Sequence, residues 1–316
     1  MSQEFQVLRY LKQILVQLET KGTPKIENSR IELIRAALAR TQMTIPEAIS
    51  QECCRVYNKL DLNGKSIYLS FIADELGHTT DSTPLYSKFF QQVMHQSGGL
   101  LFLVNLRKDL IPIRNETKKL KFLDNFLINM LRMCFSHSFL QLRRIDWDTS
   151  CSILEEIKKY ESVHKLNSIE ELKQRLGKAR RMFAYFHNAF STTPLAFISV
   201  ALTDRISNSV DRILNDTVQE VSDETKCAIF YSISSTQKGL SGIDLGSSLI
   251  KDVVAKLQQE NPRIKTFSTL SPIPGFSNWL QHNFDKFPGL VEQFHDPSKV
   301  NFTDQNVKHQ LMKACE

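Results

Sequence analysis

The sequence predicts an α+β protein of two domains, a helical bundle followed by a mixed α/β domain. Three observations lead to this prediction. Apolar residues recur at three- and four-residue spacing from about residue 3 to about residue 136, which is the period of amphipathic helices. Short β-branched and aromatic runs then follow in the order strand, loop, helix, strand. The length of 316 residues is enough for about two domains of ordinary size.

The helical domain is predicted over residues 1–136. Its apolar spacing is clearest at Leu8, Leu11, Ile14, Leu15 and Leu18, and again at Ile31, Leu33, Ile34, Ala37 and Leu38. Further helices are expected at 45–60, 66–75, 86–94 and 118–135. Turn signals at Leu62-Asn63-Gly64 and Ser97-Gly98-Gly99 separate these helices.

The second domain is predicted over residues 137–316. Residues 151–160 and 168–182 are expected to be helical, and 204–226 to form a polar helix and connector. Strands are expected at 194–203, 226–234 and 264–271, because these runs are short and rich in β-branched and aromatic residues. A helix from about Ser247 to Glu260 ends before Pro262. Phe183, Tyr185, Phe186 and Phe190 are expected in the core.

Composition indicates an ordered, water-soluble protein, with 41% hydrophobic and 23% charged residues. The net charge of +6 suits a phosphate-bearing ligand but is also common without one. The basic clusters at 118–121 and 178–181 lack the aromatic interleaving of a nucleic-acid module, so a solvated basic face is expected and no nucleic-acid partner.

The six cysteines show no CxxC spacing, which favours a reducing compartment and predicts neither a zinc site nor a disulfide framework. No apolar run is long enough for a membrane span, and residues 1–10 lack the apolar core of a secretory signal. No mitochondrial presequence is evident, and the final residues KACE are not a peroxisomal Ser-Lys-Leu signal.

A glycine-rich segment lies between the second and third predicted strands. Gly239, Gly242 and Gly246 would bend the chain and let backbone amides approach a ligand. Free amides at the start of the helix near Ser247 would hold a pyrophosphate, and Lys251 one turn later could add a charge. The spacing matches neither the dinucleotide fingerprint nor the P-loop lysine motif. An ordinary strand-to-helix turn stays open as the alternative.

Ser271 stands at the carboxyl end of the third predicted strand, before Pro272-Ile273-Pro274-Gly275. Ligands of open α/β sheets collect at this end of the strands, so a serine there could reach a bound ligand. A serine before proline is more commonly a turn or capping residue, and that alternative is also open.

Two segments resemble signature sequences of the malonyl-CoA decarboxylases: FYSISSTQKGLSGIDLG at 230–246 and FSTLSPIPGFSNWL at 267–280. The resemblance extends to SGGLLFLVNLRKDL at 97–110, SFLQLRRIDWDTSCSILEEI at 138–157 and PLAFISVALT at 194–203. It therefore covers nearly the whole chain, most closely at 226–280.

The resemblance implies a second domain with the fold of the GCN5-related N-acetyltransferases and a helical domain that makes a homo-oligomer. It implies decarboxylation of malonyl-CoA to acetyl-CoA and carbon dioxide, in fatty acid metabolism, with no metal or organic cofactor. The coenzyme A-contacting residues would be Ser241, Gly242, Ile243, Asp244, Leu245, Gly246 and Ser247, and the catalytic serine would be Ser271. By the same resemblance the compartment would be mitochondrial, peroxisomal or cytoplasmic.

One departure from the family bears on activity. In the family a histidine paired with the serine lies in a downstream segment resembling NFHLQNGA, which does not occur here. The second domain is therefore expected to be incomplete at its C-terminal end. A non-catalytic acyl-CoA-binding or assembly subunit is the alternative function, and acyl transfer to an amine is a third hypothesis. Cys151 matches a cysteine that can link subunits in the family, although a buried, inert thiol is the favoured interpretation.

Overall fold

The computed structural model describes residues 47–77, 79–80, 83–84, 86–190, 192–215, 221–272 and 275–283, with single positions at 305, 307, 309 and 312. The chain divides into two compact units, Met1–Leu270 and Ser271–Glu316. The apolar positions at 8–18 and 31–38, expected to be helical, lie outside the described residues. The helices and the sheet that position the candidate loop belong to the first unit.

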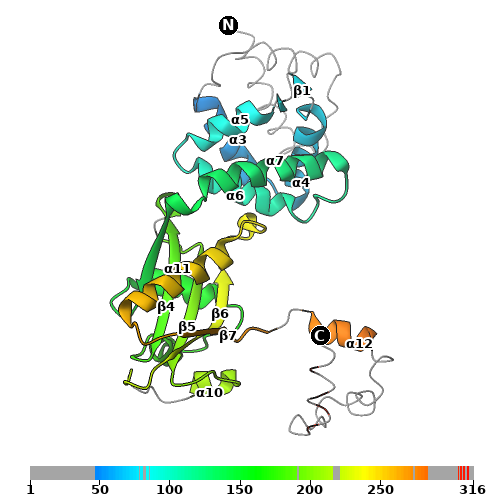
Figure 1. Cartoon of the computed structure of the whole chain (residues 1–316). Helices are drawn as coiled ribbons and strands as arrows, with labels where there is room; N and C mark the ends of the chain where they lie inside the picture. Colours follow the sequence, from blue (N-terminus) through cyan, green and yellow to red (C-terminus); the bar gives the residue numbers. More distant parts are fainter. Residues whose placement is uncertain are drawn as a thin grey trace. The chain divides into compact units, whose positions relative to one another are not determined.

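The N-terminal part of the first unit is helical (Figure 1). Its elements are α3 (Glu47–Lys59), α4 (Leu62–Glu75), the two-residue strands β1 (Thr79–Thr80) and β2 (Thr83–Pro84), α5 (Tyr86–Met94), α6 (Gly99–Leu110) and α7 (Lys118–Cys134). Side-chain caps fix two of the helix starts. Asp61 accepts a hydrogen bond from the Gly64 amide at 2.7 Å, and Thr117 accepts one from the Leu120 amide at 3.1 Å. The predicted helices at 45–60, 86–94 and 118–135 are confirmed. The helix predicted at 66–75 begins earlier, at Leu62, so the turn expected at Leu62-Asn63-Gly64 is wrong: the Asp61 cap starts the helix there.

A five-stranded sheet of order β3-β4-β5-β6-β7 forms the rest of this unit. Its strands are β3 (Leu140–Ile145), β4 (Arg180–His187), β5 (Ala196–Thr203), β6 (Cys227–Ser235) and β7 (Thr266–Thr269). Neighbours are antiparallel from β3 to β6, whereas β6 and β7 are parallel and are connected by α11 (Leu245–Glu260). The predicted combination of helices with a sheet is confirmed, and so is the order strand, loop, helix, strand.

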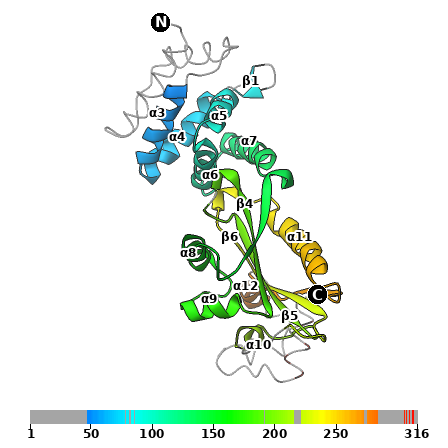
Figure 2. The same cartoon turned by 90° about the vertical axis from the view of Figure 1, so that its left-hand side faces the viewer.

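Helices cover both faces of the sheet, with α8 (Cys151–Tyr160) and α9 (Ile169–Arg175) on one side and α11 on the other (Figure 2). β4 contributes to both cores: Met182 and Phe186 pack with α8 and α9, whereas Phe183 and Tyr185 belong to the cluster that includes α11. The remaining short elements are η1 (His137–Phe139), η2 (Asn188–Phe190), α10 (Val210–Asn215), η3 (Lys238–Leu240) and, in the second unit, α12 (Phe276–His282).

The prediction of a helix over 168–182 is wrong at its C-terminal end. α9 stops at Arg175, and β4 begins at Arg180. The cause is burial of β4 on both faces, since Met182 to Phe186 then form an unbroken apolar run and no alternation marks the strand. The core positions predicted for its aromatic residues are confirmed by their burial.

The helices and the sheet share one hydrophobic core. Leu103 and Leu106 of α6 belong to the same cluster as Phe230 of β6 and Leu249 of α11. η3 approaches α6 closely at Gly239, where an added Cβ would lie 1.9 Å from the Val104 carbonyl oxygen. The predicted boundary between residues 136 and 137 does not follow a gap in this core, and it stays a prediction.

Cys151 is exposed, so the expectation of a buried thiol is wrong. It is the first residue of α8, where a side chain lies over the preceding turn rather than in the core. None of the helices in the described part of the chain combines the length and hydropathy needed to cross a membrane. In the same residues, no three His, Cys, Asp or Glu side chains gather as metal ligands would.

Candidate functional site

Seven of the eight predicted site residues form one continuous segment in the first unit, from Ser241 to Ser247, which we call the loop although its last three residues are the first turn of α11. β6 ends at Ser235, η3 follows at Lys238–Leu240, and α11 begins at Leu245. The loop therefore lies between the carboxyl end of β6 and the amino end of α11. That position suits an anion, because the first amides of a helix lack acceptors within the helix.

Of the three glycines in η3 and the loop, two stand where the backbone requires a glycine. Gly239 allows the close approach to α6, and Gly242 has φ of +84°, in the left-handed region that favours glycine. Gly246 is different, since nothing lies within 4 Å of its Cβ position and it sits in the first turn of a regular helix. The expectation that Gly246 bends the chain is therefore wrong.

Asp244 caps α11, so the helix begins two residues before the predicted start at Ser247. Asp244 Oδ1 accepts a hydrogen bond from the Ser247 amide at 3.2 Å. The pKa of the Asp244 carboxyl is lowered by hydrogen bonds from Ser247, with a smaller contribution from the nearby Lys251 ammonium. The described hydrogen bonds leave the amides of Gly242, Asp244 and Gly246 without an acceptor. These amides are free to bind a ligand.

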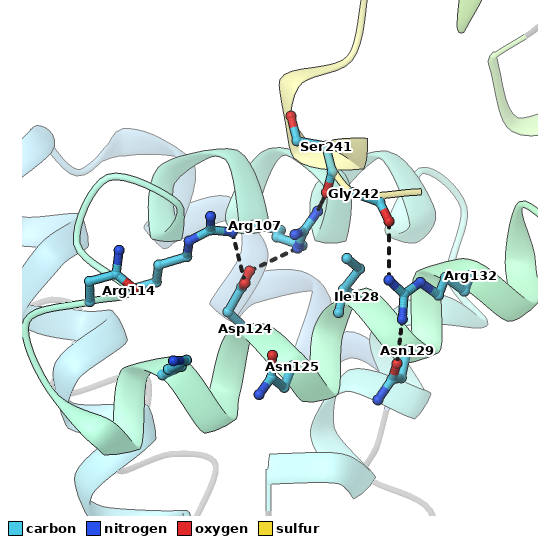
Figure 3. Close-up of a pocket in the computed structure, with 11 residues that line it drawn as sticks. Arg107, Arg114, Asp124, Asn125, Ile128, Asn129, Arg132, Ser241 and Gly242 are labelled. Atoms are coloured by element: carbon cyan, nitrogen blue, oxygen red, sulfur yellow. Dashed lines mark hydrogen bonds and ion pairs between the residues drawn. The ribbon is translucent and has the colours of Figure 1, made fainter. Parts of the chain in front are cut away.

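The carbonyl oxygens of η3 and the loop are bound by Arg107 of α6, whose side chain is 0% exposed. Its Nη1 donates to the carbonyl oxygen of Gly239 at 2.6 Å. The same atom donates to the carbonyl oxygen of Ser241 at 2.8 Å (Figure 3). Its Nε donates to Asp124 Oδ1 of α7 at 2.8 Å. The guanidinium thus ties two helices to the loop and orients the loop carbonyls toward them.

Two more arginines extend this arrangement. Arg132 of α7 donates from Nη2 to the Gly242 carbonyl oxygen at 3.1 Å and from Nη1 to Asn129 Oδ1 at 3.1 Å. Arg114 donates to Asp124 Oδ2 at 3.1 Å. The Asp124 carboxylate is consequently shared between two guanidinium groups, whereas the described partners of Arg132 are all neutral.

These side chains surround a cavity of about 660 Å³ on the helical side of the loop (Figure 3). Its lining residues are Arg107, Arg114, Asn115, Lys121, Asp124, Asn125, Ile128, Asn129, Arg132, Ser241 and Gly242. Four of them are cationic and one is anionic. The cavity shares Ser241 and Gly242 with the predicted coenzyme A loop.

A second buried carboxylate, Glu161, holds the last part of β6. Ser232 Oγ donates to Glu161 Oε1 at 2.8 Å and lies 2.9 Å from Oε2, and Ser234 Oγ lies 3.3 Å from Oε1. Arg175 Nη1 is 3.8 Å from the same carboxylate. This network fixes the strand from which the loop emerges.

Ser271 is exposed and is the first residue of the second unit. The residue before it still pairs with β6, because the Leu270 amide donates to the Phe230 carbonyl oxygen at 2.8 Å. Its expected position just after a strand is therefore confirmed. Ser241 to Ser247 are brought together in the first unit, while the approach of Ser271 to them stays a prediction.

Sequence reasoning missed Arg107, Asp124 and Arg132. One signal was available for Arg107, because it lies on the same face of α6 as the buried Leu103 and Leu110. A cation among buried apolar positions requires a partner. The identity of that partner could not be predicted, since the acceptor carbonyls lie 132 and 134 residues further along the chain.

Two family models match the chain. The model described as the malonyl-CoA decarboxylase C-terminal domain matches residues 138–311, and the one described as the malonyl-CoA decarboxylase N-terminal domain matches residues 72–135. Together these matches include the strands, α11, the arginines of α6 and α7, and both segments of predicted site residues.

Curated relatives and solved structures agree with these matches. Mitochondrial malonyl-CoA decarboxylase of Mus musculus is 40% identical over 243 residues, covering 73% of this chain and 49% of the relative. That of Anser anser anser is 42% identical over 205 residues, covering 63% and 41%. The chain thus spans under half the length of these curated relatives.

Among solved structures, malonyl-CoA decarboxylase from Rhodopseudomonas palustris matches with a TM-score of 0.74 and 26% identity, covering 99% of this chain and 79% of the other. That from Agrobacterium vitis matches with a TM-score of 0.69 and 28% identity, covering 95% and 72%. The similarity therefore extends to the fold of the described residues.

Proposed function

The chain belongs to the malonyl-CoA decarboxylase family, and on that premise we propose that it acts in the decarboxylation of malonyl-CoA to acetyl-CoA and carbon dioxide, a reaction of fatty acid metabolism. The observation that carries the proposal is the loop from Ser241 to Ser247. Three of its amides have no acceptor, and its carbonyls are turned toward Arg107 and Arg132. Such a loop suits the diphosphate of a coenzyme A thioester.

The sheet supports the further proposal of a GCN5-related N-acetyltransferase-like domain. An antiparallel series from β3 to β6 is followed by the loop, α11 and a parallel strand, as expected for that fold. β6 also runs on to Ser235, beyond its last pair with β7 at Phe230. The unpaired edge of β6 could hydrogen-bond the amide groups of the coenzyme A arm.

The reaction requires little beyond positioning and hydrogen bonding. Breaking the bond between C2 and the carboxylate carbon of malonyl-CoA releases carbon dioxide, and the bonding electron pair moves into a thioester enolate. A hydrogen-bond donor must stabilise the enolate oxygen, and a proton must then reach C2 to give acetyl-CoA. We assign the hydrogen bond to the malonyl group, and a role in the proton transfer, to Ser271.

The assembly and the compartment are also proposals. We propose a helical domain at 1–136 and a catalytic domain at 137–316, since the family models meet near that boundary. We also propose that the helical domain forms a homo-oligomer. The names of the curated relatives favour an intracellular protein and a mitochondrial location. Light scattering of the purified chain measures its oligomeric state, and a monomer at micromolar concentration would contradict the proposed assembly.

Turnover and binding together test the proposed activity. Purified protein is mixed with malonyl-CoA, release of carbon dioxide and acetyl-CoA is followed, and malonyl-CoA affinity is measured by calorimetry. Ser271→Ala should lower kcat about 100-fold or more with little change in affinity. Ser268→Ala, the same change three residues earlier on β7, is the matched control and should retain activity.

The outcomes separate the two functions. Binding of malonyl-CoA without release of carbon dioxide would contradict decarboxylation by this chain and favour the non-catalytic acyl-CoA-binding alternative. Activity retained in Ser271→Ala would show that decarboxylation does not depend on this serine. Absence of both binding and turnover would reject both functions.

A further inference from the structure

The cavity on the helical side of the loop carries cations that the protein itself does not neutralise. Asp124 is its only acidic lining residue, and Arg107 and Arg114 already share that carboxylate. Arg132 contacts only neutral oxygens, and the described interactions give the Lys121 ammonium no acceptor. The cavity therefore has an excess of positive charge available to a ligand.

A buried hydrogen-bond donor of Arg107 that has no described acceptor also indicates a ligand in this cavity. Nη2 of Arg107 is buried and donates to no described acceptor, although the same guanidinium makes three other hydrogen bonds. A buried guanidinium proton without an acceptor is unfavourable, and such orphan donors commonly mark the place of a ligand or water.

The shape of the region argues against an ordinary solvated basic face. Surface lysines and arginines usually extend from convex helices into water, whereas these side chains line a hollow of about 660 Å³, within the usual range for small-molecule sites. The amides of Asn125 and Asn129 add uncharged donors and acceptors to the same walls. Cations, amides and a hollow of this volume together suit a phosphorylated nucleoside.

We propose that this cavity binds the phosphorylated nucleotide end of the coenzyme A thioester, with Lys121 contacting its 3′-phosphate and Arg132, which is bonded to the Gly242 carbonyl, contacting its diphosphate. The proposal rests on the proposed function and extends the site from the loop onto α7. Ser241 and Gly242 connect the two parts, because they belong to the loop and also line the cavity. A ligand that passes over the edge of the loop at Ser241 and Gly242 contacts the free amides with its diphosphate and the α7 side chains with its nucleotide.

The assignment gives the two cations different roles. Arg132 is anchored by the Gly242 carbonyl, so its replacement would also disturb the loop. Lys121 is exposed, and no described group depends on its ammonium. Lys121 is consequently the residue whose replacement reports on phosphate binding alone.

Coenzyme A and dephospho-coenzyme A differ only in the 3′-phosphate, so their relative affinities test the proposal. Calorimetry on the full chain should show coenzyme A binding about fivefold more tightly than the dephospho compound. Lys121→Gln should reduce this preference about threefold and leave affinity for dephospho-coenzyme A unchanged. Asn125→Asp should also reduce it by adding negative charge. Lys118→Gln, which makes the same change on α7 outside the cavity, should not.

The measurements also separate this proposal from the function on which it rests. Equal affinity of the wild type for both compounds, or a preference that Lys121→Gln leaves unchanged, would overturn the nucleotide site while the coenzyme A loop stands. Equal weakening of both compounds by Lys121→Gln would also overturn it, because the effect would not depend on the 3′-phosphate. If neither compound binds, the proposed function fails as well.

Discussion

The buried guanidinium of Arg107 connects α6, α7 and the loop through hydrogen bonds to one carboxylate and two carbonyls. Its own desolvation offsets much of the energy of these bonds, so their presence does not show that the pair stabilises the fold overall. Removing only the arginine, however, should destabilise the fold. The change would leave the buried Asp124 carboxylate with Arg114 as its remaining partner, and it would remove this donor from the buried Gly239 carbonyl and the partly buried Ser241 carbonyl.

Arg107→Met should therefore lower the free energy of unfolding by about 3 kcal/mol, as is typical when one partner of a buried ion pair is lost. Urea unfolding followed by circular dichroism measures the change. Arg263→Met is the control, because Arg263 pairs with Asp223 at the surface, where an ion pair contributes about 0–1 kcal/mol. Equal losses in the two variants would contradict the structural role of Arg107.

The Asp252 carboxylate, which is hydrogen-bonded to Tyr185 and His137, gives a second prediction at the residue scale. Asp252 of α11 accepts a hydrogen bond from Tyr185 Oη at 2.6 Å and lies 2.8 Å from His137 Nε2. Burial alone would raise the pKa of Asp252, but the hydrogen bonds from Tyr185 and His137 lower it below its ordinary value. The ionised carboxylate is thus the form that stabilises the folded protein.

Because this carboxyl has a lower pKa when folded, its contribution is present above its unfolded pKa, about 3.9, and is lost as the pH falls through the folded value. Asp252→Asn should lower the free energy of unfolding by about 1 kcal/mol at pH 7. The difference from wild type should shrink below about pH 4. A difference that stays constant from pH 7 to pH 3 would contradict the proposed linkage.

Single residues also show where sequence reasoning stops. Ser271 and the loop at 241–247 were found from short segments, because their residue types and spacing are local properties. Asp124 lies between Leu120 and Leu127 on the apolar face of the predicted helix at 118–135, a signal like that of Arg107, whereas nothing in the period of the helix distinguishes Arg132 from other surface charges. Their importance comes from partners brought together by folding, which local periodicity cannot reveal.

At the scale of elements, predictability depended on how each element is buried. α11 has one buried face, formed by Leu249, Val253 and Leu257, and its period is therefore readable in the sequence. β4 is buried on both faces, so its pattern was mistaken for the end of a helix. β3 was not predicted either, since it carries exposed arginines at Arg143 and Arg144 and has a strand neighbour on only one side.

Gly239 and Gly246 give a prediction at the scale of elements, because the same change to alanine should have opposite effects on stability at the two positions. Gly239→Ala should destabilise the protein by about 2 kcal/mol, because the new Cβ would meet the Val104 carbonyl of α6. Gly246→Ala has open space and a helical position, so it should raise stability by about 0.5–1 kcal/mol. Thermal unfolding of the two variants distinguishes these effects.

Affinity for coenzyme A should also distinguish Gly246→Ala from Gly239→Ala. If the Gly246 amide contacts the diphosphate, its new methyl group would meet the ligand, and Gly246→Ala should weaken coenzyme A binding about tenfold in a protein that is no less stable. Calorimetric titration measures this. Unchanged affinity in Gly246→Ala would remove that amide from the proposed contact, whereas weakened affinity in Gly239→Ala alone would indicate an effect through the fold.

At the scale of the molecule, the helical part and the sheet are joined by both apolar and polar contacts. The cluster that contains Leu103 and Leu106 continues into β6 and α11, and Arg107 adds hydrogen bonds across the same junction. Two family models meet close to residue 136, whereas the contacts within the structure show no separation there. The place where the family models meet is thus not a gap in the packing.

This continuity predicts that the helices and the sheet of the first unit unfold together. Native-state hydrogen exchange should give the slowest amides of α6 and α7 the same opening free energy as those of β5 and β6. Leu103→Ala, which removes a fully buried side chain of α6, should lower both values equally, by about 3 kcal/mol. Lower protection confined to the helices would instead show that the bundle opens independently, and the loop would then lose Arg107 without global unfolding.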